Sequence, residues 1–325
     1  MRVGLLGLGR IGAFHAATLA AHPRVDELVV ADADGARAAG IAAGLNAGVG
    51  DPFDADAVVI ATPTATHAEL LTRACAQGVP VFCEKPVAPG VEDTVRVLKA
   101  ARRSGVVVHI GFQRRFDAGY VAARDALRGG ELGTLHRVHL VTADPAPPAP
   151  GYLPLSGGIF RDCHIHDFDI LRWVTGREVD TVYATGANRG EAFFAEAGDV
   201  DTSAALLTLD DGTLVTVQGS RYNGAGYDVR MELAGTLRTQ TAGLGARAPL
   251  SGVEGSGPPD DPWPDFQARF AAAYIAEIDA FLSAARGDTG SPCTVQDALA
   301  ALHIAEAAEL SRREGRPVRM AEVVQ

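Results

Sequence analysis

Gly7-Leu8-Gly9-Arg10-Ile11-Gly12 joins an apolar run, Arg2 to Gly7, to a helical pattern that begins at Ala13. A G-x-G-x-x-G turn between a strand and a helix is typical of a site that binds a dinucleotide. The first glycine permits a tight turn, the second lets the backbone approach a pyrophosphate, and the third lets helix and strand pack closely. The N-terminus of the helix then faces the anion. The stretch therefore predicts a dinucleotide-binding fold at the start of the chain.

An acidic residue lies at the end of the second predicted strand, where such a fold needs one. Asp32 follows Gly12 by 32 − 12 = 20 residues, the usual spacing for a carboxylate that accepts hydrogen bonds from the adenosine ribose. It would repel a 2'-phosphate, and neither Ala33 nor Asp34 offers a positive charge to hold one. The pattern predicts NAD rather than NADP, the alternative being a glycine turn with an incidental surface aspartate.

Short β-branched runs alternate with helical patterns through the first third of the chain. Regular alternation of this kind indicates βαβ units, which form a doubly wound parallel sheet with helices on both faces. We therefore expect a Rossmann domain over residues 1–117. Its strands are expected at 2–7, 27–31, 57–61, 79–83 and 106–111, and its helices at 13–21, 33–44, 67–77 and 91–104.

The remaining residues, 118–325, predict an α+β domain with an open, mostly antiparallel sheet. Asp210-Asp211-Gly212 is a strong hairpin signal between two strands. Helices are expected at 118–128, 161–174, 265–285 and 295–313, and strands at 135–143, 178–186, 203–209, 213–220 and 227–233, the last four as successive antiparallel strands. Such a sheet covers one face with its own helices. We expect a homo-oligomer, a homotetramer, built through the other face.

Composition excludes several classes of function. The net charge of −11 is spread along the chain with no basic stripe, so nucleic acid is not an expected partner. No apolar run reaches the roughly 18 residues that cross a bilayer. The four cysteines form no C-x-x-C pair, which indicates free thiols in a reducing compartment, and we expect a cytoplasmic protein. They are Cys75, Cys83, Cys163 and Cys293.

A lysine stands at the end of a predicted strand in Cys83-Glu84-Lys85-Pro86. Doubly wound domains place their ligands at the carboxyl edge of the sheet, so Lys85 is expected to face the ligand crevice. The alternative is an exposed cation before a proline turn.

Asp162 and His166 lie four residues apart at the start of a predicted helix, so we expect them to share one face. Alcohol oxidation needs a group that takes the hydroxyl proton, and an imidazole that titrates near neutrality suits that role. Asp162 would orient the ring; a purely structural Asp-His cap is the alternative. No metal site is expected, because His164 and His166 would point about 200° apart around a helix.

At this point the sequence resembles the family of glucose-fructose oxidoreductases, inositol dehydrogenases and related sugar dehydrogenases over essentially its whole length. Within that family it is most similar to the inositol 2-dehydrogenases. The resemblance rests on the glycine turn and on six further segments: Ala61 to His67, Glu84 to Pro86, Gly111 to Asp117, Asp144 to Pro148, Ser156 to Asp169, and Gly226 to Arg230.

The resemblance implies that Lys85, Asp162 and His166 form a catalytic triad, with His166 as proton acceptor and Lys85 hydrogen-bonded to the reacting oxygen. It implies that Asp144, Tyr227 and Tyr274 line a polyol pocket with the triad. Asp144 before prolines is also a common turn initiator, and Tyr227 could be a packed strand aromatic. The implied cofactor residues are Gly7, Gly9, Arg10, Ile11, Gly12, Asp32, Thr62, Pro63, His67, Glu84, Lys85 and Arg115.

Two long segments are expected to be loops. The stretch from Asp144 to Gly158 is unusually long for a compact domain, which more often indicates a binding loop than a spacer. The stretch from Ser251 to Pro264, rich in glycine, proline and aspartate, is expected to be either a mobile loop or a simple linker.

The implied activity is NAD-dependent oxidation of a cyclic polyol, myo-inositol to its 2-keto form. The sequence departs from the inositol pattern at Ala143, where a Ser-Arg-Asp-Pro motif would place arginine, at Gln113 in place of asparagine, and at Cys163-His164 in place of Met-Thr. A monosaccharide or a modified inositol therefore stays open as substrate. An NAD-dependent glycosidase and a non-catalytic NAD-binding regulator stay open as well, although a regulator would not need the triad.

Overall fold

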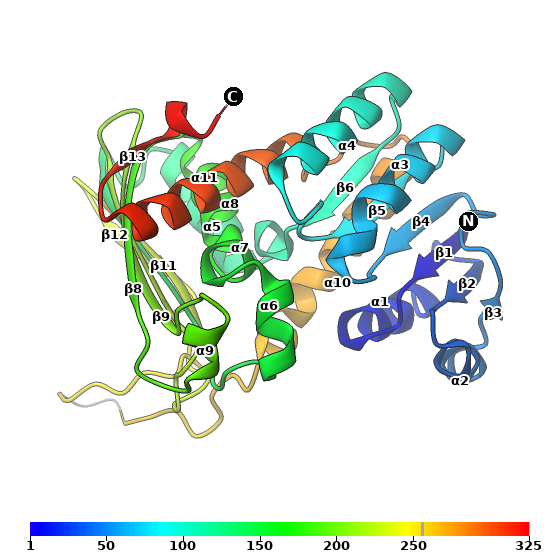
Figure 1. The fold of residues 1–325 in the computed structure, drawn as a ribbon, viewed down its shortest axis with the longest axis horizontal. Helices are drawn as coiled ribbons and strands as arrows, with labels where there is room; N and C mark the ends of the chain where they lie inside the picture. Colours follow the sequence, from blue (N-terminus) through cyan, green and yellow to red (C-terminus); the bar gives the residue numbers. More distant parts are fainter. Residues whose placement is uncertain (255–256, 325) are drawn as a thin grey trace. The chain divides into compact units, whose positions relative to one another are not determined.

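The computed structural model describes residues 1–254 and 257–324 and divides into two units (Figure 1). Unit one consists of Met1–Gln113 and Tyr274–Leu299, and unit two of Arg114–Ala273 and the residues from Ala300 onward. The sequence placed the boundary after residue 117 and assigned everything beyond it to the second domain. In the structure, the segment 274–299 belongs to unit one.

The sheet of unit one is the predicted doubly wound sheet. Its six strands are all parallel and lie in the order β3-β2-β1-β4-β5-β6. The chain adds strands on one side of β1 up to β3 and then on the other side from β4 onward. Doubly wound folds bind their ligands at this switch point between β1 and β4. The strands are β1 (Arg2–Leu6), β2 (Glu27–Ala31), β3 (Gly48–Val49), β4 (Ala57–Ile60), β5 (Val81–Glu84) and β6 (Val108–Gly111).

Helices α1 (Arg10–Ala20), α2 (Gly35–Leu45), α3 (His67–Gln77) and α4 (Val91–Ser104) connect these strands. Local sequence explains where they begin and end. The Asp34 carboxylate accepts hydrogen bonds from the backbone of Ala36 and Arg37 at the start of α2, as an N-cap residue does. Asn46 ends α2 with a left-handed backbone at φ +53°.

Helix α10 (Phe266–Ala285) closes the core of unit one. Its residues Ile278, Phe281 and Leu282 are fully buried and pack in one cluster with Leu5 of β1 and Phe82 of β5. This long-range packing explains why a segment near the C-terminus belongs to the N-terminal unit, because the hydrophobic face of the sheet needs a cover.

Unit two contains a seven-stranded sheet in the order β12-β11-β7-β10-β9-β8-β13. The hairpin predicted at Asp210-Asp211-Gly212 joins β9 to β10, with Gly212 at φ +87°. The expectation of four successive antiparallel strands is wrong at β10, which pairs with β7 in parallel, and β11 pairs with β7 instead of β10. The strands are β7 (Leu135–Ala143), β8 (Val179–Ala187), β9 (Thr202–Leu209), β10 (Leu214–Ser220), β11 (Asp228–Gly235), β12 (Thr239–Ala242) and β13 (Val318–Arg319).

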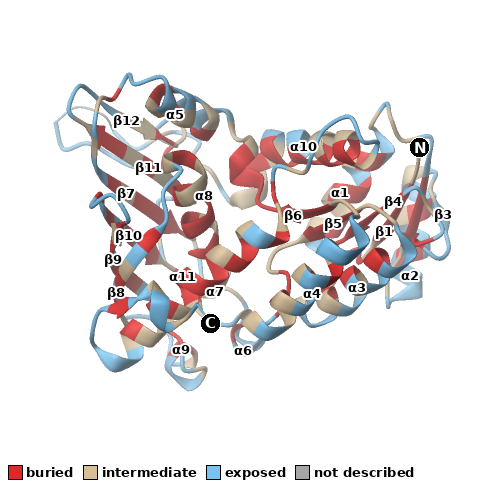
Figure 2. Ribbon diagram, turned by 90° about the horizontal axis from the view of Figure 1, so that it is seen from above, coloured by how far each residue is buried: buried red, intermediate tan, exposed pale blue. Residues whose placement is uncertain are grey.

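The helices of unit two differ from expectation in three places, one of which is the short helix α9 (Phe193–Glu196), which the sequence did not predict. The continuous helix expected over 161–174 is divided into α7 (Ile159–Asp162) and α8 (Ile165–Thr175), and the loop expected from Asp144 to Gly158 contains the short helix α6 (Leu153–Ser156). Buried residues gather on α8 and on the strands of the sheet (Figure 2). The other helices are α5 (Ala118–Arg128) and α11 (Val295–Glu314), which begins in unit one.

The expected loop from Ser251 to Pro264 contains no helix or strand at its described positions; residues 255–256 of that stretch lie outside the described residues. Among the helices of the described residues, none combines the length and hydropathy of a membrane span.

Candidate active site

The glycine turn follows β1 directly and leads into α1, as its spacing predicts. Gly7 has φ +87°, and a Cβ atom there would lie 2.6 Å from the backbone of Ala61. A Cβ on Gly9 would meet nothing within 4 Å. Gly9 is exposed at the N-terminus of α1, so its missing side chain leaves open space where an anion would approach the backbone. These residues fit a dinucleotide pyrophosphate.

Asp32 follows β2 and is fixed beside this turn. Its carboxylate accepts hydrogen bonds from the backbone N–H groups of Leu8, at 2.6 Å, and Asp34, at 2.8 Å. Burial raises the pKa of Asp32, but these backbone donors and the charge of Arg37 outweigh it and lower the pKa below its ordinary value. The carboxylate is therefore ionised at neutral pH, as a ribose acceptor must be.

Arg37 is a cation that the sequence pattern did not single out. Its Nη1 lies 3.4 Å from Oδ1 of Asp32, and its side chain is 48% exposed. It lies in the first turn of α2, five residues after Asp32. The prediction of NAD considered only Ala33 and Asp34, the two residues after the aspartate, and therefore missed this cation.

His67 connects the segments that follow two neighbouring strands. Its Nε2 lies 2.8 Å from the carbonyl oxygen of Thr62, after β4, and its Nδ1 lies 2.7 Å from that of Pro86, after β5. The ring is 1% exposed. The hydroxyl of Thr62 faces that of Thr66 at 2.7 Å. His67 thus links the segment after β4 to the segment after β5 at the carboxyl edge of the sheet.

Glu84 and Lys85 lie at the end of β5, at the carboxyl edge of the sheet. Glu84 Oε1 lies 2.7 Å from Nε2 of the buried His15 on α1, and Lys85 precedes Pro86 through a cis peptide bond. Tyr274 belongs to unit one, is 4% exposed, and makes edge contacts with the rings of Phe14 and His15.

In unit two, the structure brings two predicted acidic residues together around an arginine. Arg221 Nη1 donates to Oδ2 of Asp144 at 3.0 Å, and its Nη2 donates to Oδ2 of Asp162 at 2.7 Å. The hydroxyl of Tyr152 donates to Oδ1 of Asp162 at 2.9 Å. The sequence motifs indicated both carboxylates but neither Arg221 nor Tyr152.

Asp162 and His166 do not share one regular helix. Asp162 is the last residue of α7, and His166 lies in the first turn of α8, after the turn at Cys163 and His164. The backbone N–H of His166 bonds to the Cys163 carbonyl, three residues back. The expectation that four-residue spacing alone places both side chains on one helix face is therefore wrong.

His164, which the sequence suggested only as a metal ligand to be weighed, belongs to a buried network. Its Nδ1 lies 2.7 Å from Oδ2 of Asp167 and its Nε2 lies 2.8 Å from Oγ of Ser203. Asp167 also accepts from Thr142 and pairs with Arg114. The acid, imidazole and hydroxyl follow the order of a nucleophilic triad. Ser203 is only 2% exposed, so the network is a structural one.

Arg115 is also held inside unit two. Its Nε and Nη2 donate to the two carboxylate oxygens of Asp169, at 2.8 and 2.5 Å, the geometry of a bidentate pair. Tyr227 is 6% exposed, and its backbone N–H donates to the Trp263 carbonyl at 2.7 Å.

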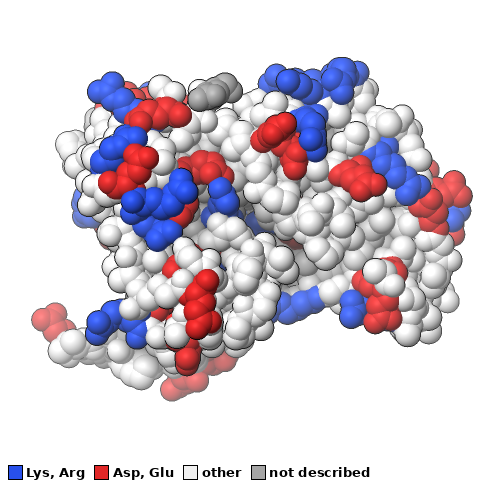
Figure 3. Space-filling model, viewed as in Figure 1, with Lys and Arg blue, Asp and Glu red and all other residues white. Residues whose placement is uncertain are grey.

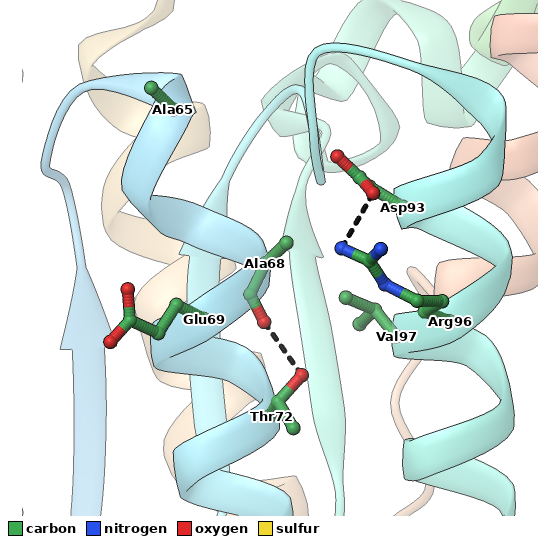
Figure 4. A pocket seen from close by; sticks show the side chains of 7 residues that line it. All are labelled: Ala65, Ala68, Glu69, Thr72, Asp93, Arg96 and Val97. Atoms are coloured by element: carbon green, nitrogen blue, oxygen red, sulfur yellow. Dashed lines mark hydrogen bonds and ion pairs between the residues drawn. The ribbon is translucent and has the colours of Figure 1, made fainter.

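A surface pocket between α3 and α4 contains none of the predicted site residues (Figure 4). It is lined by alanines, by Thr72, whose hydroxyl donates to its own helix, and by the Asp93–Arg96 ion pair at 2.6 Å. Glu69 is the remaining charged residue of its lining, and it is exposed on α3; because the pocket contains no predicted site residue, we assign it no role in the chemistry.

Two further features bear on possible ligands. His109, Glu277 and Cys293 bring ligand atoms within 4.8 Å of one another. The His109 ring stacks on Phe82 at 5.4 Å, and its Nε2 lies 3.8 Å from Oε1 of Glu277. All three residues are fully buried, so we interpret them as a polar cluster inside the core of unit one. On the face drawn in Figure 3, acidic and basic side chains are intermixed.

Comparison with known proteins extends this interpretation over the whole chain. Residues 1–112 match the model of an oxidoreductase family with an NAD-binding Rossmann fold, and residues 120–239 match the GFO/IDH/MocA C-terminal domain. The chain is 39% identical to the myo-inositol dehydrogenase Hyg17 of Streptomyces leeuwenhoekii, covering 97% of this chain and 98% of that protein. It is 36% identical to an inositol 2-dehydrogenase of Rhizobium meliloti, covering 99% of both.

Solved structures show the same likeness. A myo-inositol dehydrogenase from Corynebacterium glutamicum, 34% identical, aligns with a TM-score of 0.90 over 98% of each chain. A scyllo-inositol dehydrogenase from Lactobacillus casei with bound NAD(H) and scyllo-inositol, 28% identical, aligns with a TM-score of 0.90 over 99% of each chain. From the glycine turn to the last helix, this chain belongs to the GFO/IDH/MocA family of NAD-binding oxidoreductases.

Proposed function

We propose that this chain oxidises a ring hydroxyl of a cyclic polyol, converting myo-inositol to its 2-keto form with NAD as hydride acceptor. The observation that carries the proposal is the full-length likeness to proteins named inositol dehydrogenases, at 36 to 39% identity. Lys85, Asp162 and His166, to which the family resemblance assigns this chemistry, are all present.

The cofactor side of the proposal rests on unit one. The open space at Gly9 would admit the pyrophosphate, and the ionised Asp32 would accept hydrogen bonds from the ribose hydroxyls. Arg10 and Ile11 would contribute backbone N–H groups at the start of α1. When bound, NAD supplies the nicotinamide carbon that accepts the hydride.

The chemical side assigns one task to each of three residues. Lys85 donates a hydrogen bond to the reacting oxygen, and His166 accepts its proton while the carbon loses hydride. Asp162 stabilises the charged imidazole. The C–H electron pair leaves as hydride and the O–H proton moves to His166, so the alcohol becomes a ketone. Asp144 and Tyr227 would bind the other hydroxyls; these roles are proposals that follow from the family resemblance.

A monosaccharide or a modified inositol is the second candidate substrate, and Ala143 favours it. Ala143 ends β7 next to Asp144 and is 8% exposed. Its methyl group cannot donate the hydrogen bonds that an arginine would at this position. The hydroxyls that the site recognises could therefore differ from those of the inositol enzymes.

The test is a panel of inositol isomers, aldoses and methylated inositols with NAD and, separately, NADP, followed by nicotinamide absorbance. We expect turnover of myo-inositol with NAD. Turnover of a monosaccharide alone would replace the proposed substrate with the second candidate. Tight NADH binding without turnover of any polyol would indicate a regulator and overturn the proposal.

The proton acceptor is tested by His166→Ala in the same assay. We expect turnover to fall by about a hundredfold or more, the usual contribution of a general base, with NADH binding unchanged. Full turnover in this variant would show that another group accepts the proton.

We also propose that the chain works as a cytoplasmic homotetramer assembled through the sheet of unit two. Side chains alternate between buried and exposed along β9 and β10, and the exposed ones include Leu206 at 46% and Leu214 at 52%. A partner would remove these apolar side chains from water. The four buried cysteines are free thiols, which suits a reducing compartment. Light scattering coupled to size exclusion would measure the assembly, and a monomer would contradict it.

A further inference from the structure

Arg221 and Asp144 meet because of the parallel pairing that the sequence did not predict. Strands β7 and β10 run parallel with Ala143 opposite Ser220. Asp144 follows β7 and Arg221 follows β10, so the two residues lie side by side at the carboxyl ends of these two strands. The backbone N–H of Asp144 bonds to the Ser220 carbonyl at 2.9 Å, which extends the pairing to this point.

The guanidinium of Arg221 then joins two segments that are distant in sequence. One nitrogen binds Asp144 at 3.0 Å, and the other binds Asp162, at the end of α7, at 2.7 Å. The arginine side chain is 4% exposed, while Asp144 retains 24% exposure and Asp162 retains 12%. Arg221 is thus buried behind two carboxylates that still reach solvent.

The charges explain why the arginine matters. Two carboxylates share one guanidinium, so the group carries one net negative charge in a poorly solvated place. Burial raises the pKa of Asp144, and the charge and hydrogen bond of Arg221 oppose this rise. Without Arg221, the two carboxylates would repel each other and one would take up a proton.

We propose that Arg221 is a positioning residue that holds Asp144 and Asp162 as a pair of ionised acceptors for two hydroxyl groups of the substrate. This inference rests on the proposed function, because it takes the substrate to be a polyol. Ionised carboxylates accept hydrogen bonds only, and they make stronger bonds to hydroxyl donors than neutral groups do. The pair selects a ligand that presents two donor hydroxyls together.

The test compares Arg221→Met, Arg221→Lys and a control, Arg172→Met, in the full chain. Arg172 also makes a bidentate pair, with Glu178, and its side chain is 14% exposed. For Arg221→Met we expect the polyol KM to rise roughly tenfold or more, with NADH affinity unchanged. The acid limb of the pH profile of kcat/KM should move to higher pH, because without the arginine the carboxylates lose their protons only at higher pH.

The other two variants separate positioning from a merely structural role. Arg221→Lys should return the acid limb towards wild type but leave KM raised, since an ammonium restores the charge without the planar fork. Arg172→Met should keep the wild-type KM and pH profile, whatever stability it loses. A folded Arg221→Met with wild-type KM and pH profile would overturn the proposal, as would equal changes in Arg172→Met.

A direct titration keeps this inference distinct from the proposed function. If the wild-type chain oxidises no polyol, the proposed function fails, and the pKa of Asp144 can still be measured without substrate. Carbon-13 NMR of the aspartate carboxyl groups, with the Asp144 signal identified through Asp144→Asn, reports it. We expect a higher pKa for Asp144 in Arg221→Met. An unchanged pKa would exclude the positioning role.

Discussion

Gly12 lies so close to Gly7 that a Cβ atom on Gly12 would be 1.9 Å from the Gly7 carbonyl oxygen. Gly9 lies between them in the sequence, and a Cβ atom on it would meet nothing within 4 Å. Three glycines of one motif therefore meet different physical demands: two are required by the fold itself, and one leaves room for a ligand.

This difference predicts that one alanine substitution lowers stability and another weakens cofactor binding. Gly12→Ala should lower the free energy of unfolding by about 3 kcal/mol, because the new methyl group overlaps backbone atoms that cannot move freely. Gly9→Ala should keep the wild-type melting temperature and weaken NADH binding by about tenfold or more, since its methyl group fills the anion's space. Thermal unfolding and NADH fluorescence titration measure the two effects. Wild-type NADH affinity in Gly9→Ala would contradict the proposed pyrophosphate position.

Asp32 and Arg37 together predict a change of cofactor preference. In Asp32→Ala, the carboxylate that would repel a 2'-phosphate is lost, and Arg37, 48% exposed, is released from it. The ratio of kcat/KM for NAD to that for NADP should fall by roughly a hundredfold. The double variant Asp32→Ala with Arg37→Ala should lose NAD activity without gaining NADP activity. Equal NADP use by both variants would show that Arg37 does not contact the phosphate.

The buried His164 predicts that Gly219 of β10 tolerates no side chain. A Cβ there would lie 2.3 Å from Nε2 of His164 and 2.9 Å from Oγ of Ser203. Gly219→Ala should therefore cost about 2 kcal/mol or more of folding free energy. Gly40, exposed within α2 with open space around it, is the control. Gly40→Ala should stabilise the chain by about 0.5–1 kcal/mol, and denaturant titration compares the two.

Tyr120 predicts a loss of stability in alkali. It is fully buried on α5, and burial raises its pKa to about 12, with Arg114 opposing the rise. Between pH values of about 10 and 12 the unfolded phenol loses its proton while the folded one keeps it, so stability falls as pH rises, by up to about 1.4 kcal/mol per pH unit. The difference in unfolding free energy between wild type and Tyr120→Phe should therefore change above about pH 10 and stay constant below it. A constant difference throughout would refute the shift.

The sequence predicted most of the fold because most of it is local. Val91–Ser104, Ala118–Arg128 and Leu135–Ala143 begin and end at the predicted residues, since periodicity and capping residues determine them. The parallel pairing of β7 with β10 was missed. Whether two strands run parallel depends on partners distant in the chain, and the alternating pattern of each strand is the same in either direction.

The site residues can be divided in the same way, into those that local sequence determines and those that depend on distant strand pairing. Gly7, Gly12 and Asp32 could be predicted because one βαβ unit fixes their spacing. Arg221 could not, because only the parallel register places the end of β10 beside Asp144. Had β10 run antiparallel to β7, Arg221 would have emerged at the opposite edge of the sheet.

Residues 274–299 belong to unit one although they follow most of unit two in the sequence, and this has a consequence for folding during synthesis. The sheet of unit one is complete once Gly111 has been made, but Ile278 and Phe281, which cover it, follow more than a hundred residues later. On the ribosome, the first unit to emerge thus gains its full hydrophobic core only after Arg114–Ala273 of unit two has been synthesised, and its sheet keeps an uncovered face until then. A gene fragment ending at residue 113 should accordingly yield an aggregating product, and co-expression of the missing helix should rescue it.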